Sequence, residues 1–538
     1  MLSHRAWMCV LTAFLASSGM QAAPQGAPQA TGLAQSPPGN VPTLHVTSSL
    51  VFLDVTVLDK GGRPVTKGLT RDDFTITEDK KPQRIFSFEA PEVHIAKARP
   101  DDLQKDNNAP VTILVLDLLN SDFEDFAYIR YEVQRFLNAQ PAELNSAAEL
   151  MVVGNRSLEL LQGYTRSRQD LLDALKHLPA ALPYKKMSLS FFDERFEQSI
   201  DALQQIALQN RGIPGRKNVI WVGHGGPGLN TDFLVGKIVD DLQRYVHATT
   251  NMMVESRISL FVIYPGLKVG GANFSLSAMD AAADPGDTDP FAGDINFGVF
   301  VNETGGELFF NRNDIDHEMQ QSLQMGSNYY TLTYQPQNED ANGKFRRIRV
   351  AMRDPKLRAV TKTGYFAPEK IAPDDPHQTM LVNLAEAARS TIPFQALSLR
   401  VLQITRHADN RSAEFTMQLL GKNLDWQPTE NGKRTASVLV AGFNLSSQNV
   451  VLASRIERLT LTGEITDPER LERSLSQFPI ILHLNRKTSS VRLVVETEDG
   501  TRLGSTEVAR KTIDTAPDTP TPEPTLLPSP RPSVSAAN

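Results

Sequence analysis

The sequence predicts an α/β domain with a doubly wound, mostly parallel sheet, flanked by all-β sandwich modules. Residues 111–117 read VTILVLD, a continuous apolar run that is typical of a strand buried on both faces of a parallel sheet. Residues 125–138 follow with apolar side chains at helical spacing. Because such strands and helices continue to alternate along the chain, we expect a parallel sheet with right-handed crossovers.

The same alternation places the other elements of this domain. Each expected strand is short and apolar, and each expected helix carries one apolar stripe. The expected strands are residues 149–153, 218–222, 258–264 and 305–310, and the expected helices are residues 168–178, 193–210, 231–249 and 314–324.

Segments with the period-two pattern of strands lie on both sides of the α/β domain. Those before it are residues 45–58, 74–77 and 84–88, and those after it are residues 328–335, 345–352 and 359–365. Because neither set is large enough to form a secure core alone, we hypothesise that the two share one sandwich into which the α/β domain is inserted. Beyond a helix expected at 380–390, the strands 397–404, 413–419, 437–443, 455–462 and 491–498 predict a second sandwich.

The two ends of the chain predict export. Residues 1–5 are short and basic, residues 6–16 are apolar, and small residues lead to Ala22, which is the order found in a secretory signal. The apolar run is too short to span a bilayer, so an integral membrane protein is not expected. The single cysteine, Cys9, lies inside this signal, and a mature chain without disulfides fits a secreted, periplasmic or cell-envelope protein of a bacterium.

These patterns give the following organisation. We expect a signal peptide at 1–22, a disordered linker at 23–43, a β-rich segment at 44–95, the α/β domain at 108–325, a β-rich segment at 326–368, a sandwich-like domain at 380–510 and a disordered Pro-rich tail at 511–538. The net charge of -7 comes without a clustered basic face, so nucleic acid is not an expected partner.

Two strand ends carry the candidate functional residues, because ligands of open α/β sheets bind at the carboxyl ends of the strands. The first is Asp117 with Asn120 and Ser121, and the second is His224 in the sequence GHGGPG. The His-Gly-Gly-Pro-Gly loop resembles the oxyanion loop of proline iminopeptidase-type hydrolases, whose backbone N–H groups stabilise a developing oxyanion. That alternative requires a Gly-x-Ser-x-Gly nucleophile elbow, which the chain lacks.

Other enzyme motifs are also missing. His317-Glu318 is not followed by the second histidine of a zincin, and neither a Walker loop nor a Rossmann glycine motif opens a helix after the first strand. The Asp-rich residues 266–297 fail the spacing of a calcium loop and are expected to form a surface loop. The sequence therefore predicts no enzyme and no catalytic residue.

The chain resembles the von Willebrand factor A-related proteins of acidobacteria. The matching pieces are VFLDVTVLDKGGRPVTKGLTRDDFTITEDKKPQRIFSFE, VTILVLDLLNS, YTRSRQDLLDALKHL, KNVIWVGHGG, RISLFVIYPG, TGGELFFNRNDID, SNYYTLTYQP and KFRRIRVAMRDPKLRAVTKTGYFAP, over residues 45–368. The resemblance implies an adhesion domain with a metal-ion-dependent site, in which a partner's carboxylate completes the coordination of a divalent cation.

That implied site is degenerate in this chain. Asp117 and Ser121 match the first and last positions of its Asp-x-Ser-x-Ser motif, but Leu119 replaces the middle serine. Ser188 or Ser190 would have to replace the threonine of the second loop, and His224 stands where the third-loop aspartate belongs. We therefore expect no cofactor, or at most a weakly held divalent cation such as Mg²⁺ on Asp117 and Ser121. The alternative role of Asp117 is to cap the amides of the following loop or helix.

Together these observations predict an exported, non-enzymatic binding, adhesion or scaffold protein. Its partner would be a protein of unknown identity, and Asn120 and His224 would belong to the ligand-binding face.

Overall fold

The computed structural model describes the chain from residue 50 to residue 518 with gaps, and all of the described residues belong to the unit Ser49–Asn538. The described ranges are 50–94, 109–121, 123–154, 158–178, 189–226, 228–230, 236–265, 289–291, 294–312, 314–368, 376–407, 411–421, 424–429, 433–463, 470–471 and 473–518. The expected signal peptide and linker, most of the Asp-rich segment 266–297, and residues 519–538 of the expected tail lie outside them. The described end of that Asp-rich segment is not a surface loop as predicted, because Asp294–Ile295 forms strand β11, Phe297 begins a helix, and Ile295 and Phe297 are buried.

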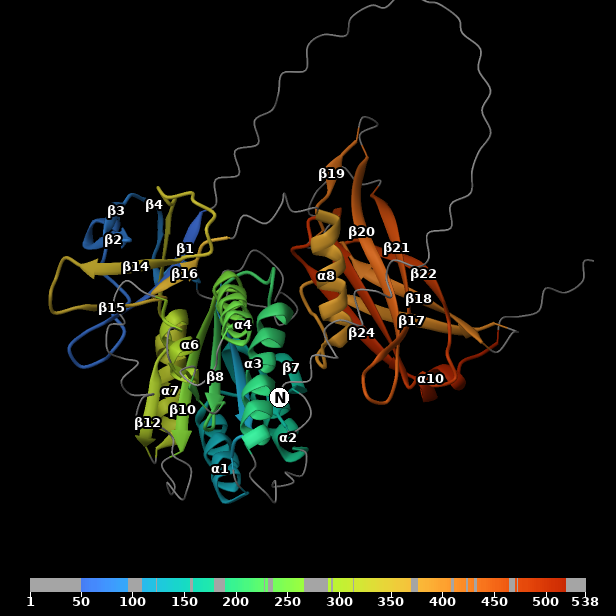
Figure 1. Ribbon diagram of the computed structural model, residues 1–538, viewed down its shortest axis with the longest axis horizontal. Coiled ribbons are helices and arrows are strands. Elements are labelled where there is room, and N and C mark those ends of the chain that lie inside the picture. The colour runs from blue at the N-terminus through green and yellow to red at the C-terminus, as the bar shows by residue number, and fades with distance from the viewer. Residues whose placement is uncertain are drawn as a thin grey trace, which may run out of the picture. The chain divides into compact units, whose positions relative to one another are not determined.

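A six-stranded, mostly parallel sheet forms the centre of the α/β domain (Figure 1). Its order is β12-β10-β8-β5-β6-β7, and all neighbours are parallel except the antiparallel pair β6 and β7. The strands are β5 (Val111–Asp117), β6 (Glu143–Val153), β7 (Leu158–Ser167), β8 (Lys217–Val222), β10 (Ile258–Pro265) and β12 (Leu308–Arg312). A mostly parallel sheet was predicted and is confirmed, but the edge strand β7 was missed.

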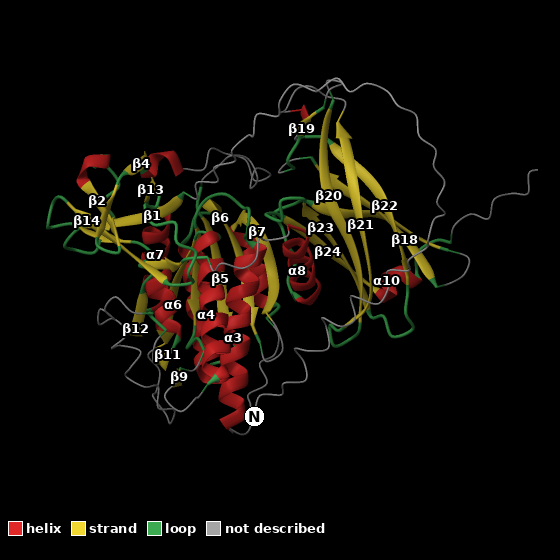
Figure 2. Ribbon diagram, turned by 45° about the horizontal axis from the view of Figure 1, so that its top comes forward, coloured by secondary structure: helices red, strands yellow, loops and turns green. Residues whose placement is uncertain are grey.

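Helices cover both faces of this sheet, and Figure 2 shows α3 and α4 lying in front of the strands. One face carries α1 (Phe123–Ala139), α2 (Arg168–Lys176) and α7 (Ile315–Ser327), and the other carries α3 (Leu189–Gln209), α4 (Lys237–Glu255) and α6 (Phe297–Thr304). Strand β5 explains why both faces are apolar: Ile113 and Val115 pack with the α3 side, whereas Leu114 and Leu116 pack with the α1 side. Helix α4 is shifted relative to the predicted 231–249: its N-cap is Gly236, whose φ of +62° is not helical, and its buried stripe continues through Met253.

A β module is built from strands on both sides of the α/β domain. One sheet has the order β15-β1-β13-β4 and the other β16-β14-β2-β3. The strands are β1 (Val51–Leu58), β2 (Phe74–Glu78), β3 (Lys81–Gln83), β4 (Ile85–Glu89), β13 (Tyr330–Tyr334), β14 (Phe345–Met352), β15 (Arg358–Val360) and β16 (Gly364–Phe366). The single strand predicted at 359–365 is two strands, because β15 pairs with β1 while β16 pairs with β14 in the other sheet.

The C-terminal β domain follows helix α8 (Pro376–Arg389). One of its sheets has the order β17-β18-β22, and in the other β20 pairs with β19, β21 and β23, and β23 pairs with β24. The strands are β17 (Leu399–Arg406), β18 (Ser412–Leu420), β19 (Gln427–Pro428), β20 (Arg434–Leu445), β21 (Val451–Gly463), β22 (Leu475–His483), β23 (Ser490–Thr497) and β24 (Leu503–Ala509). Strands β19, β22 and β24 were not predicted from the sequence.

The tail predicted from residue 511 starts too early. Helix α10 (Arg510–Asp514) buries Ile513 in the core of the C-terminal β domain. The backbone N–H of Arg406 then donates a hydrogen bond to the carbonyl of Pro517. Folded structure therefore extends to Asp518, because one apolar side chain within this polar segment completes the core.

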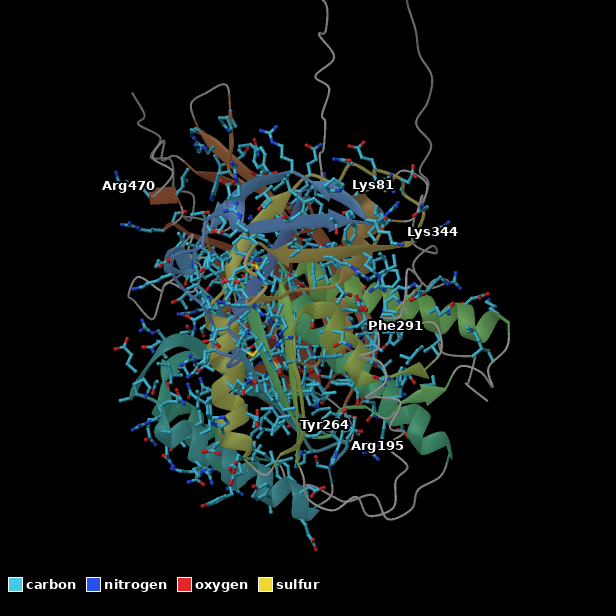
Figure 3. The ribbon with its side chains drawn as sticks, turned by 90° about the vertical axis from the view of Figure 1, so that its left-hand side faces the viewer. Lys81, Arg195, Tyr264, Phe291, Lys344 and Arg470 are labelled. Atoms are coloured by element: carbon cyan, nitrogen blue, oxygen red, sulfur yellow. The ribbon has the colours of Figure 1, made fainter. Side chains whose placement is uncertain are left out.

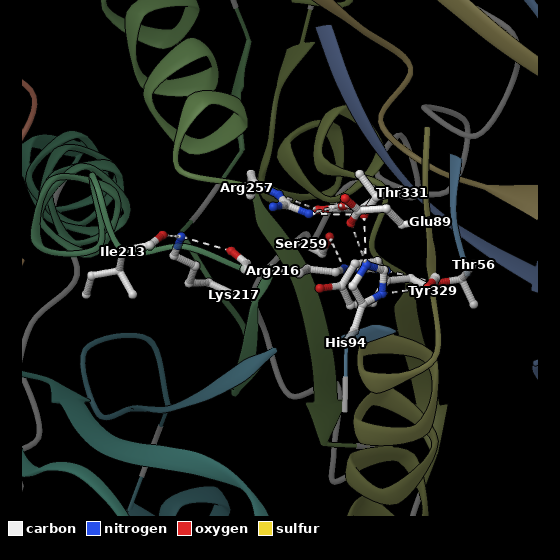
Figure 4. Close-up of polar contacts among 12 residues, drawn as sticks. Thr56, Glu89, His94, Ile213, Arg216, Lys217, Arg257, Ser259, Tyr329 and Thr331 are labelled. Atoms are coloured by element: carbon white, nitrogen blue, oxygen red, sulfur yellow. Dashed lines mark hydrogen bonds and ion pairs between the residues drawn. The ribbon is translucent and has the colours of Figure 1, made fainter. Parts of the chain in front are cut away.

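Buried polar contacts attach the β module at the amino ends of the central strands (Figure 4). Arg216, just before β8, donates to Thr56 Oγ1 of β1 over 2.9 Å. Arg257, just before β10, forms a bidentate ion pair with Asp54 of β1. Burial alone would raise the pKa of Asp54, but the charge and hydrogen bonds of Arg257 hold this pKa below its ordinary value. The β module thus contacts the amino ends of the strands, at the end of the sheet opposite to their carboxyl ends.

Candidate functional site

The candidate site lies between β5 and β8, where successive strands begin to be added on the opposite side of the sheet. From β5 the chain crosses to β6 on one side, and from β8 it crosses to β10 on the other, while β5 and β8 are neighbours. In an open α/β sheet such a point leaves a crevice beyond the carboxyl ends of the two strands. Asp117 is the last residue of β5, and Gly223 and His224 follow β8.

The close approach of the two strand ends explains Gly223. Its φ is +143°, and a Cβ at this position would lie 2.4 Å from Cβ of Asp117. Only glycine fits such a contact and such a φ without strain. The glycine brings the loop after β8 directly against the Asp117 side chain.

Asp117 is fully buried and holds the two loops together. Its Oδ1 accepts a hydrogen bond from the backbone N–H of Asn120 at 2.8 Å, and its Oδ2 accepts from Trp221 Nε1 at 3.0 Å and from the backbone N–H of Gly225 at 2.8 Å. The Asn120 Nδ2 lies 3.2 Å and 3.1 Å from the two carboxylate oxygens. Burial raises the pKa of Asp117, and the hydrogen bonds from Trp221 and Asn120 oppose that rise.

Asn120 connects this carboxylate to helix α3. Its Nδ2 donates to Ser199 Oγ at 3.1 Å, and its Oδ1 accepts from Arg195 Nε at 2.9 Å. Ser199 in turn donates to the carbonyl of Arg195, one helical turn earlier. The guanidinium of Arg195, a residue labelled in Figure 3, is therefore placed at the strand ends by a chain of hydrogen bonds that starts at Asp117.

His224 lies on the other side of the site. Its Nε2 is 3.2 Å from Asp125 Oδ2 of helix α1, and its ring meets the edge of Tyr264 with centroids 6.0 Å apart. The His224 side chain is 19% exposed, so one side of the ring reaches solvent. The structure thus brings Asp117, Asn120 and His224 to one end of the sheet.

The remaining residues of the expected metal motif contribute little. Leu119 is buried in the apolar core, and the Oγ of Ser121 is buried without a hydrogen-bond partner among the described residues. Ser188 lies outside the described residues, and for Ser190 only the backbone position in α3 is described.

A hard divalent cation does not fit this set of groups. Mg²⁺ requires several oxygen ligands with free lone pairs, close to octahedral geometry. Both oxygens of Asp117 already accept N–H donors, Leu119 offers no ligand, and a guanidinium lies on Asn120. In the part of the chain that the structure describes, no group of three or more His, Cys, Asp or Glu side chains is placed to hold a metal.

The position of the Gly225 amide bears on the alternative that the loop after β8 stabilises an oxyanion. Of the loop amides, the N–H of Gly225 donates to Asp117 and so does not face an oxyanion. The φ of Gly225 is +67°, and a Cβ there would lie 2.7 Å from the Phe297 ring. The glycine thus serves close packing between the loop and helix α6.

Sequence reasoning missed Arg195, Ser199 and Trp221. Arg195 and Ser199 are polar residues four positions apart in α3, and in the sequence such a pair resembles any solvated helix surface, although Ser199 is fully buried in the fold. Trp221 lies within an apolar strand, where an aromatic residue reads as core. Only the folded chain shows that their polar atoms converge on Asp117 and Asn120.

Comparison with known proteins gives structural likeness only. No protein-family model matches the chain, and no curated protein matches it. The conserved hypothetical protein BatB from Bacteroides thetaiotaomicron aligns at 14% identity over 40% of this chain and 97% of that one, with a TM-score of 0.23. The SpRpn10 VWA domain aligns at 18% identity over 30% of this chain and 77% of that one, with a TM-score of 0.19.

A third solved structure is a point mutant of the PilB minor pilin from Streptococcus sanguinis. It aligns at 9% identity over 43% of this chain and 63% of that one, with a TM-score of 0.25. These alignments cover less than half of the chain at low TM-scores, so the strand order, and not the likeness, defines the class. The fold is a mostly parallel α/β sheet domain with flanking antiparallel β modules. Among the described helices, none is long and apolar enough to cross a membrane.

Proposed function

We propose that this chain is an exported, non-enzymatic binding protein of the von Willebrand factor A type. Its α/β domain would hold a protein partner at the carboxyl ends of the central strands, without a metal ion. The export part of the proposal rests on the N-terminal sequence, where a basic start, an apolar run and small residues follow one another.

The strand order supports the assignment to this type. Numbered along the chain, the six strands lie in the order 3-2-1-4-5-6, with helices on both faces, and this order supports a doubly wound arrangement. The same segments carry the sequence resemblance, from VTILVLDLLNS in β5 to TGGELFFNRNDID around β12. In this fold the ligand site is expected beside β5 and β8, where Asp117 and His224 lie.

The contact between Arg195 and Asn120 carries the proposal. In a metal-ion-dependent adhesion site a bound cation offers its open position to a carboxylate of the partner. Here the guanidinium of Arg195 is fixed at the strand ends by Asn120, which is itself fixed by Asp117. A guanidinium binds carboxylates through directed, charge-assisted hydrogen bonds. Arg195 would therefore bind the carboxylate of a partner's Asp or Glu in place of the cation. Asp117 would position Arg195 through Asn120.

Site-specific photo-cross-linking tests this function. A benzophenone amino acid replaces the exposed Glu194 next to Arg195, or, as a control, the exposed Tyr131 in α1. The full chain is then irradiated with the envelope fraction of its source organism. We expect a discrete protein adduct from position 194 only. Adducts of equal yield from both positions would show that the strand-end face is not the binding surface.

The role of Arg195 is tested in the same assay. Arg195→Ala should remove the adduct, and Arg195→Lys should retain part of it because the charge remains but the planar fork is lost. Arg244→Ala is the matched control, since Arg244 is an exposed arginine of the same domain on α4. Adduct yields that fall equally in the Arg195 and Arg244 variants would contradict a specific role for Arg195.

A further inference from the structure

A cleft with a volume of about 360 Å³ opens in the β module, away from the strand ends described above. We call it the β2–β4 cleft. Its apolar wall consists of Phe74, Ile76 and Ile85, and its rim carries Arg71, Arg84 and Arg353. Its volume falls at the lower end of the range of small-ligand and peptide pockets.

The course of the chain produces this cleft. Strand β3 pairs with β2 from Glu78↔Lys81 to Ile76↔Gln83, and there the pairing ends. The chain then leaves at Arg84 and enters the other sheet as β4, which pairs with β13. The first residues of β2 therefore have no β3 neighbour. A notch at the end of a strand pair offers backbone groups to an incoming extended segment.

The rim of the cleft is positively charged. Arg353 is held by the carbonyl of Asp72 at 2.5 Å and by Asp73 at 3.4 Å. Asp72 also lines the cleft, so one acid opposes three arginines there. Arg71 and Arg84 are exposed, and within the described residues neither guanidinium has an ion-pair partner. The rim thus favours a ligand that brings carboxylates.

Gln83 favours a ligand that also carries a hydrogen-bond donor, in addition to the carboxylates favoured by the arginines. Its side chain lines the cleft and is only 8% exposed. The Nε2 donates to the carbonyl of Lys81 at 3.2 Å, but among the described residues nothing donates to Oε1, which is buried. A buried acceptor without a donor costs free energy, and an N–H of a bound peptide would relieve that cost. A fully deprotonated inorganic anion has no donor to offer.

We propose that the β2–β4 cleft binds a short acidic peptide segment in extended conformation. Its carboxylates pair with Arg71 and Arg84, one backbone N–H donates to Gln83 Oε1, and an apolar side chain covers Ile85. This site is independent of the proposed partner site at Asp117 and Arg195, because it lies on a different module and shares no residue with it.

Fluorescence anisotropy with a defined probe tests the proposal. The probe is a fluorescein-labelled peptide of alternating Glu and Val, and the protein is the full chain. We expect saturable binding that weakens as salt rises. Arg84→Gln should weaken it about tenfold, the effect of one charge-assisted hydrogen bond. Lys81→Gln is the matched control, because Lys81, labelled in Figure 3, is an exposed cation of the same module that does not line the cleft.

A second peptide separates a peptide site from a general anion site. It has the same side chains, but its backbone amides are N-methylated, so no N–H can reach Gln83 Oε1. We expect this peptide to bind much more weakly than the first. Equal affinity of the two peptides, equal losses in Arg84→Gln and Lys81→Gln, or no binding of the first peptide at low salt would each overturn the proposal.

Discussion

The indole Nε1 of Trp221 donates a hydrogen bond to Oδ2 of Asp117 across 3.0 Å, between two neighbouring strands of the sheet. This bond uses a lone pair that a metal ligand would have to keep free. Together with the N–H of Gly225 it makes Asp117 the fixed point of both strand-end loops. Asp117 therefore acts as a structural anchor of the candidate binding face.

Replacement of this anchor should be costly. In Asp117→Ala the donors of Trp221, Asn120 and Gly225 lose their common acceptor, and each buried donor left unsatisfied costs about 1–3 kcal/mol. Ser121→Ala should be nearly neutral, because Ser121 Oγ has no partner among the described residues. Denaturant unfolding of the two variants measures both effects. Similar, small losses in both would contradict the anchoring role.

Divalent cations should not stabilise the protein. A ligand that binds only the folded state raises the melting temperature by mass action, and a metal lost to a chelator lowers it. Because both oxygens of Asp117 are engaged, we expect equal melting temperatures in excess EDTA and in Mg²⁺, Mn²⁺ or Ca²⁺. Calorimetry gives the independent check. Saturable micromolar binding that disappears in Asp117→Ala would restore the metal site.

A buried carboxyl in β6 predicts a pH-dependent stability. Glu149 is fully buried, receives a hydrogen bond from Gln209 Nε2 at 3.3 Å, and burial raises its pKa from 4.5 to about 8. A raised pKa in the folded state stabilises the protein fully below the unfolded pKa, and this stabilisation is lost as pH rises through about 8. The free energy of unfolding should therefore fall between pH 4.5 and about 8.

The variant Glu149→Gln isolates this effect, because other buried acids are common to both proteins. We expect Glu149→Gln to lack this part of the fall and to be more stable than the parent chain at about pH 8, where the parent must ionise a buried group. Unfolding curves at a series of pH values test it. Parallel pH profiles of the two proteins would show that Glu149 is not the titrating group.

The attachment of the β module depends on Asp54 and Arg257. Asp54→Ala would leave Arg257 without its bidentate partner and should cost about 3–5 kcal/mol. Arg257→Met in the same chain should recover part of that loss, because it removes the unpaired charge. A double-mutant cycle measures the coupling. Strictly additive losses would indicate that the ion pair contributes nothing to the junction.

The sequence predicted those elements whose environment matches a simple pattern. Strand β5 was recognisable because both of its faces are buried, so its residues form one apolar run. Strand β7 was missed because it is an edge strand with a half-exposed, mixed sequence, and β22 contains Pro479 within an otherwise alternating pattern.

The candidate site was predictable to the same limited extent. Asp117 and His224 stood out because they follow apolar strands, and strand ends meet at one edge of a parallel sheet. Arg195 is 75 residues away from Asn120 in the sequence, and only tertiary packing brings its guanidinium to the Asn120 side chain. Local sequence patterns therefore could not predict the contact between Arg195 and Asn120, on which the proposed function rests.

The central claim is that the strand-end face binds its partner through Arg195 and not through a metal. The most direct measurement is the yield of the cross-linked adduct from position 194, compared in excess EDTA, in Mg²⁺ and in the Arg195→Ala chain. We predict equal yields in EDTA and Mg²⁺ and loss of the adduct in Arg195→Ala. An adduct that requires Mg²⁺ and persists in Arg195→Ala would contradict the account.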